Sequence, residues 1–209
     1  MKNRNGSIRV ALAAASTAAL AATTMLVGAG TSAADPASLT LNYKCAFPLI
    51  GGQPIEISIE LDLPKTVAVG AEVPATAIKT VSKVGKNATA GLNLMGAKTL
   101  EGTALAGAAI AAPEAELPLE VPATLEKTPI PASGEFSVVA TGETPPITFT
   151  QAGTAKITVG EVNLHLVPRK ADGSLTPLKE FDSKCTQEPN QNNELTTIEI
   201  TPAAEGVRR

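Results

Sequence analysis

Hydrophobic and polar residues alternate with a period of two along much of the chain. Residues 55–61 place four aliphatic side chains on one face and Glu56, Ser58 and Glu60 on the other. The same alternation recurs in residues 136–141, 147–149, 157–159, 162–166 and 198–200. Turn-forming residues separate these runs: Gly51-Gly52, Pro145-Pro146, Gly153 and Asp172-Gly173. About ten short strands at this spacing predict an all-β fold, namely an immunoglobulin-like, two-layer antiparallel sandwich.

The core of this sandwich is predicted from the inward apolar positions of the alternating segments. They are Ile55, Ile57, Ile59, Phe136, Phe149, Leu164 and Leu166.

Two segments break the alternation. Residues 87–96 read as a short helical turn, capped by Asn87 and ended by Gly96, although Asn87-Ala88-Thr89 is also an N-glycosylation triplet. Residues 113–131 contain five prolines and are either a linker between two sub-domains or an edge strand with proline on its solvent side. We favour the edge strand, and with it a single domain over residues 35–202, followed by a flexible tail at 203–209.

The first 34 residues have the three parts of a secretion signal. Lys2, Arg4 and Arg9 precede an uncharged stretch over residues 10–30, and the small residues Ser32-Ala33-Ala34 precede Asp35. The alternative is an uncleaved membrane anchor, which the scarcity of large apolar residues disfavours. We therefore expect cleavage after Ala34 and a soluble, secreted protein with no stable membrane insertion.

Cys45 and Cys185 are the only cysteines, and they lie near the two ends of the predicted mature chain. In an exported protein such a pair predicts a disulfide, with Cα atoms about 4.4–6.8 Å apart. Period-two alternation places Cys45 on the face of Tyr43, and Cys185 on the face of Phe181, so both sulfurs are predicted to point inward. A reactive thiol pair is the alternative, but it usually needs a C-x-x-C spacing that is absent.

The composition leaves few residues for chemistry. The chain has one histidine, no Trp, one Tyr and four Phe, so neither a zinc site nor an aromatic stacking platform is expected. No G-x-S-x-G elbow or phosphate-binding glycine motif is present. His165 is predicted to be an exposed strand residue, and the glutamates mostly occupy outward strand positions. We therefore predict that the protein is not an enzyme and holds no cofactor or metal.

Charge disfavours a nucleic-acid partner. Because Lys2, Arg4 and Arg9 belong to the predicted signal, the mature chain would carry a net charge of −6 rather than −3.

Residues 182–193 form the most polar segment, which reads as one loop beside the predicted disulfide. Its Asn and Gln side chains either form a recognition surface or satisfy backbone groups of the turn, and we favour the second role.

Several segments together resemble a known family. They are Leu41-Asn42-Tyr43-Lys44-Cys45-Ala46-Phe47-Pro48-Leu49-Ile50-Gly51, Ala90-Gly91-Leu92 with Gly96-Ala97, residues 130–134, and Phe181-Asp182-Ser183-Lys184-Cys185-Thr186-Gln187. With them the chain resembles a secreted domain of unknown function of actinobacteria such as streptomycetes, the DUF family numbered 6801. This resemblance implies export and supplies no catalytic residues.

Two functional hypotheses follow, with the oligomeric state left open. The first is a secreted, non-enzymatic β-sandwich protein that associates with the cell envelope, loosely with the wall, or binds another protein. The alternative is an extracellular module that binds a small ligand or a glycan, against which the missing aromatic platform counts.

Overall fold

The computed structural model describes residues 33–203. Residues 1–32 of the predicted signal lie outside the described residues. The predicted tail also lies outside them, apart from residue 203. Within the described range there are twelve strands and one helix, α1 (Lys86–Leu94). The strands are β1 (Ala34–Phe47), β2 (Gly51–Pro64), β3 (Thr66–Ala68), β4 (Glu72–Val73), β5 (Ala77–Val84), β6 (Thr99–Ala111), β7 (Glu116–Pro129), β8 (Phe136–Glu143), β9 (Ile147–Thr148), β10 (Gly153–Arg169), β11 (Phe181–Gln187) and β12 (Glu194–Thr201).

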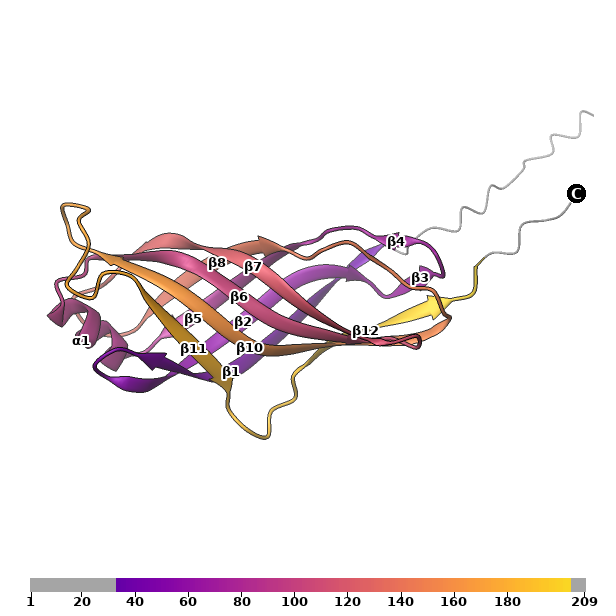
Figure 1. The fold of residues 1–209 in the computed structure, drawn as a ribbon, viewed down its shortest axis with the longest axis horizontal. Helices are drawn as coiled ribbons and strands as arrows, with labels where there is room; N and C mark the ends of the chain where they lie inside the picture. Colours follow the sequence, from indigo (N-terminus) through magenta and orange to yellow (C-terminus); the bar gives the residue numbers. More distant parts are fainter. Residues whose placement is uncertain (1–32, 204–209) are drawn as a thin grey trace, which may run out of the picture.

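Eight of these strands form one closed antiparallel barrel. Their order is β11-β1-β2-β5-β8-β7-β6-β10, and a further pairing of β10 with β11 closes the ring. Figure 1 shows the resulting long barrel, with its strands inclined to the long axis. The prediction of a two-layer sandwich was therefore wrong. Each strand does have one apolar face, as a sandwich would require. These faces are buried in the interior of a single curved sheet, however, and not between two stacked sheets.

The remaining elements lie at the two ends of the barrel. At the end where the described chain begins and finishes, β12 pairs with β10, β3 pairs in parallel with β12, and β4 forms a two-stranded sheet with β9. Helix α1 lies at the opposite end (Figure 1) and buries Ala88, Thr89 and Leu92.

The ends of α1 differ in how well the sequence predicted them. The N-cap residue is Gly85, which makes no side-chain hydrogen bond, so the predicted cap at Asn87 was wrong. Gly96 does end the helix, with a φ of 76° that favours glycine. Its N–H donates to the Asn93 carbonyl at 2.9 Å, and the Ala97 N–H donates to the Leu92 carbonyl at 3.0 Å, which is the Schellman pattern.

The predicted core residues point into the barrel. Ile55, Ile57, Ile59, Phe149 and Leu166 are buried, whereas Phe136 and Leu164 are half-buried and pack against the core.

The proline-rich segment forms part of the barrel wall. Strand β7 pairs with β6 along nearly its whole length and with β8 over Ala123–Leu125, so it is neither a linker nor an edge strand. Pro118 and Pro122 lie in the part of β7 that is not paired with β8. Their missing N–H groups therefore cost no hydrogen bond between these two strands.

Candidate functional site

The barrel encloses two adjoining apolar cavities, of about 100 Å³ and about 80 Å³. Five side chains line both of them: Ile59, Thr80, Ala106, Ala123 and Val159. The cavities therefore follow one another along the barrel axis.

The cavities exist because one side of the barrel is built from small residues. An eight-stranded barrel is just wide enough for its inward side chains to fill. Here β6 points Ala104, Ala106 and Ala108 inward, and Ala104 faces Ala123 of β7 across the strand pair. Ala106 and Ala123 are both half-buried, and both border the two cavities. Residues of this size leave the interior partly unfilled.

The lining of both cavities carries no charge. Its polar side chains are Thr80, Ser82 and Thr144, and all other lining residues are apolar or glycine. A charged group placed here would lose its hydration without a partner. The interior is therefore chemically suited to a hydrocarbon group.

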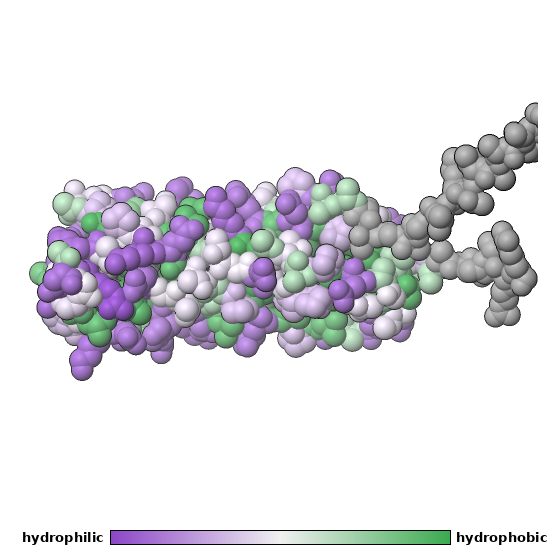
Figure 2. Space-filling view, turned by 90° about the horizontal axis from the view of Figure 1, so that it is seen from above, coloured by the Kyte–Doolittle hydropathy of each residue, from purple (hydrophilic) through white to green (hydrophobic). Residues whose placement is uncertain are grey.

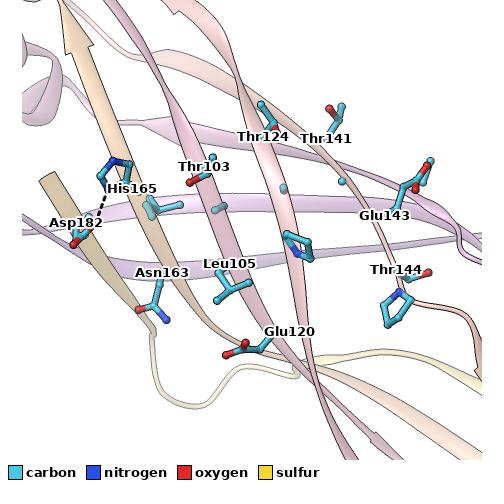
Figure 3. A pocket seen from close by; sticks show the side chains of 18 of the residues that line it. Thr103, Leu105, Glu120, Thr124, Thr141, Glu143, Thr144, Asn163, His165 and Asp182 are labelled. Carbon is cyan, nitrogen blue, oxygen red and sulfur yellow. Dashed lines mark hydrogen bonds and ion pairs between the residues drawn. The ribbon is translucent and has the colours of Figure 1, made fainter. Parts of the chain in front are cut away.

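A wide, shallow hollow lies on the outer face of the barrel over β6, β7, β8, β10 and β11, with a volume of about 1480 Å³. Thr103, Thr124 and Thr141 stand side by side on three neighbouring strands, as Figure 3 shows. Figure 2 shows one outer face of the barrel, where hydrophilic side chains mix with others of intermediate hydropathy and hydrophobic patches are small.

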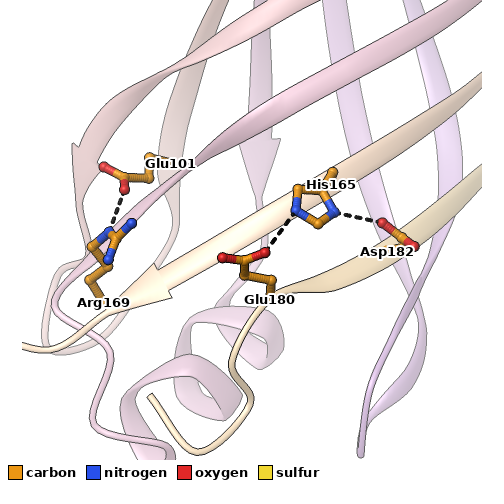
Figure 4. Close-up of polar contacts among 5 residues, drawn as sticks. All are labelled: Glu101, His165, Arg169, Glu180 and Asp182. Atoms are coloured by element: carbon orange, nitrogen blue, oxygen red, sulfur yellow. Dashed lines mark hydrogen bonds and ion pairs between the residues drawn. The ribbon is translucent and has the colours of Figure 1, made fainter. Parts of the chain in front are cut away.

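His165 lies on this outer face, as predicted, with 45% of its side chain exposed. The sequence did not reveal its partners. Its Nδ1 lies 2.8 Å from Asp182 Oδ1, directly across the β10–β11 pair, and its Nε2 lies 3.4 Å from Glu180 Oε2 (Figure 4). The hydrogen bond with Asp182 raises the pKa of His165, and Glu180 adds to this. Both ring nitrogens therefore face carboxylates, which stabilise the protonated ring.

The half-buried ion pair of Arg169 with Glu101 also appears in Figure 4. Arg169 donates a second hydrogen bond to the Gly173 carbonyl at 3.2 Å, which ties the β10–β11 connection to the barrel.

Cys45 and Cys185 form the predicted disulfide. They face each other directly in the β1–β11 register, with their Cα atoms 3.9 Å apart, closer than the range predicted, and both are fully buried. The buried Tyr43 hydroxyl donates to the Gly160 carbonyl at 3.0 Å and accepts from Gln187 at 3.2 Å. Burial raises the pKa of Tyr43, and the Gln187 hydrogen bond opposes this.

The polar segment 182–193 is a loop only after Gln187, because residues 182–187 belong to β11. Its amides mainly serve backbone groups, as predicted. Gln187 Nε2 donates to the Val159 carbonyl at 2.7 Å, Asn193 Nδ2 donates to the same carbonyl at 2.9 Å, and Gln191 Oε1 accepts from the Asn42 N–H at 2.7 Å.

Among residues 33–203, no helix is long and apolar enough to cross a lipid bilayer. In the same part of the chain, no three His, Cys, Asp or Glu side chains come together as a metal site would require.

Comparison with known proteins places the chain in a family. No curated protein matches its sequence. A crystal structure of a "Putative membrane anchored protein from Corynebacterium diphtheriae" resembles it over 82% of this chain, with 15% identity and a TM-score of 0.43, and the match spans 38% of that longer chain. The actinobacterial origin suggested by the sequence stays a prediction. Residues 42–196 match a family of unknown function, DUF6801, to which the chain therefore belongs.

Proposed function

We propose that this protein is an exported, non-enzymatic binding protein whose barrel interior takes up a small apolar ligand. The observation that carries this proposal is the pair of adjoining cavities with an uncharged lining. Small-ligand binding was the alternative hypothesis from the sequence, and a barrel with unfilled interior volume favours it over a sandwich that acts only through its surface. Association with the cell envelope or a protein partner stays a prediction.

The size of the cavities limits the ligand. An apolar cavity of about 150 Å³ in another protein stays dry and binds benzene. The cavities here, of about 100 Å³ and about 80 Å³, are of that order when taken together. A single aromatic ring or a short alkyl chain fits this space, whereas a sterol or a haem does not.

Two further observations support an exported protein without catalytic activity. The Cys45–Cys185 disulfide is of the kind that persists in oxidising compartments. The hydroxyl groups of the cavity lining, those of Thr80, Ser82 and Thr144, have no His, Asp, Glu, Lys or Cys beside them in the lining that could act as an acid or a base or activate them.

Filling the cavity tests the proposal. Ala106 lines both cavities, so Ala106→Leu should occupy the space that the ligand needs. We expect benzene to raise the melting temperature of the wild-type protein and to leave that of the Ala106→Leu variant unchanged. Ala123→Val is a milder filling variant for the case in which leucine disturbs the fold, which circular dichroism will show.

The matched control is Ala111→Leu, which adds the same side chain to an exposed position of the same strand. It should retain the benzene-induced shift. A wild-type protein that does not respond to benzene, or equal responses in all of these variants, would refute the proposal.

A further inference from the structure

The barrel wall is incomplete between β7 and β8. These strands pair only over Ala123–Leu125 and Ala140–Gly142, whereas the first half of β7, residues 116–122, is paired with β6 alone. After β8 ends at Glu143, the chain continues through Thr144-Pro145-Pro146 into β9, which pairs with β4 and not with β7.

Proline explains why no ladder forms here. Pro118 and Pro122 of β7 have no N–H, and neither have Pro145 and Pro146 beyond the end of β8. At Gly142 the two backbones approach so closely that a Cβ atom would collide with the Pro122 carbonyl oxygen. Beyond this glycine the two segments cannot make a regular set of backbone hydrogen bonds.

The unpaired stretch lies over the larger cavity. That cavity is lined by Leu119 and Val121 of β7 on one side and by Thr144 and Ile147 on the other. Leu119 and Ile147 point inward yet are only half-buried. On the outside, the hollow reaches Pro122, Thr144, Pro145 and Pro146, so only a thin part of the wall separates the hollow from the cavity.

The segment opposite β7 is held at both ends. Thr144 donates its N–H to the Thr76 carbonyl at 2.9 Å, and the Thr150 N–H donates to Glu114 Oε1 at 2.8 Å. The hydrogen bond from Thr150 lowers the pKa of Glu114, so this tie is to an ionised carboxylate. The gap therefore ends at this hydrogen bond on one side and, on the other, at the short β7–β8 seam, where residues 123–125 pair with residues 140–142. We take this seam as the part of the wall that separates when the gap widens.

We propose that the ligand is a single-chain amphiphile, whose hydrocarbon tail enters the barrel between β7 and β8 while its polar head stays in the outer hollow. This inference rests on the proposed function. The tail matches the uncharged cavities, and the head matches the hollow, into which Thr124 and Thr141 present hydroxyl groups beside the gap. Because the tail space is limited, the chain has about six carbons.

The charges around the gap determine which polar head groups the ligand can carry. Glu120 of β7 and Glu143 of β8 both line the hollow, one from each side of the gap (Figure 3), and neither has an ion-pair partner among the described residues. An anionic head would meet two like charges. A neutral or cationic head is therefore favoured at this end of the hollow, whereas the basic side chains that line it, His165 and Lys184, lie on β10 and β11, beyond β6.

Closing the seam covalently tests the route. Thr124 and Thr141 face each other directly across β7 and β8, so Thr124→Cys with Thr141→Cys allows a disulfide there. The control pair is Ala111→Cys with Glu116→Cys, which face each other across β6 and β7, where pairing is already almost continuous, and which lie outside the hollow. Both bridges lie at exposed positions, so a mild reductant reaches them before the buried native disulfide.

The probe is a fluorine-tagged hexanol, whose exchange between free and bound states is measured by fluorine NMR. We expect the β7–β8 bridge to slow exchange about tenfold, reversibly on reduction, and the β6–β7 bridge to leave it unchanged. Equal exchange rates in both bridged proteins would overturn the proposed route while the proposed function stands. A wild-type protein that binds neither hexanol nor benzene would instead refute the proposed function itself.

Head selectivity gives a second, independent readout. Hexanol and hexylamine should bind more tightly than hexanoate, and Glu120→Gln with Glu143→Gln should raise the affinity for hexanoate several-fold relative to that for hexanol. Hexanoate that binds as tightly as hexanol to the wild-type protein would overturn the assignment of the head to this part of the hollow.

Discussion

His165 is an exposed side chain whose charge state depends on a neighbouring strand. Asp182 stands directly across from it on β11, and Glu180 lies just before that strand, so the imidazole sits between two carboxylates. These contacts raise its pKa above the ordinary value of 6.5, chiefly through the hydrogen bond with Asp182.

This arrangement predicts a pH-dependent contribution to stability. A raised folded-state pKa stabilises the fold fully below pH 6.5, and the contribution is lost as pH rises through the folded-state pKa. His165→Gln should therefore lower the melting temperature at about pH 5 and have no effect at about pH 9. The effect will be small because the groups are exposed.

Since His165 is the only histidine in the chain, its titration can be followed by NMR without assignment of other rings. Asp182→Asn should move its pKa back toward the ordinary value. An unchanged pKa in this variant would show that the hydrogen bond is not its main cause.

At the scale of elements, the joint between β1 and β11 depends on covalent support. The two strands pair over only three positions, Tyr43 with Gln187, Lys44 with Thr186, and Cys45 with Cys185, and the last of these carries the disulfide. The bond thus joins the first barrel strand to the last one in a short section of the wall.

Loss of this bond should be costly. The disulfide closes a separation of 140 residues, for which the loop-entropy model gives up to about 5 kcal/mol. Cys45→Ala and Cys185→Ala should each lower the free energy of unfolding by an amount of this order. The double variant should lose little more, because either single change already breaks the bond. Denaturant titration measures all three, and additive losses would contradict a shared bond.

At the scale of the whole molecule, every barrel strand has an inner and an outer face, and the two faces tolerate polar or charged substitutions to very different degrees. Ile57 and Glu56 are neighbours on β2, but Ile57 is 5% exposed within the barrel while Glu56 forms an exposed pair with Lys83 at 2.7 Å. A change of charge should therefore have very different consequences at these adjacent positions.

We expect Ile57→Asp to prevent folding, because it removes about 1.5–3 kcal/mol of apolar burial and places a charge in an interior without partners. Glu56→Lys should fold normally, with a small loss from the exposed pair. Circular dichroism and thermal melting of both variants check this. A folded Ile57→Asp protein would contradict the assignment of the inner face.

Local patterns in the sequence determined which residues face inward and where several elements end. Period-two alternation identified Ile55, Ile57 and Ile59 as core, since successive side chains of a strand must point to opposite sides. It also placed both cysteine sulfurs inside. Gly96 was recognisable as a helix end because few other residues adopt its backbone conformation. The inner face of the Ala-rich strand β6 was not recognisable in this way, because alanine gives little contrast between the two faces of a strand.

Only the tertiary structure decided between a sandwich and a barrel. Alternation requires each strand to bury one face, and both architectures satisfy that requirement equally well. The choice depends on which distant strands pair, and here β11 pairs with both β1 and β10 and so closes the ring. The partners of His165, the gap beside β7 and the apolar cavities all follow from that closure. They arise from contacts between residues far apart in the chain, which no local pattern encodes.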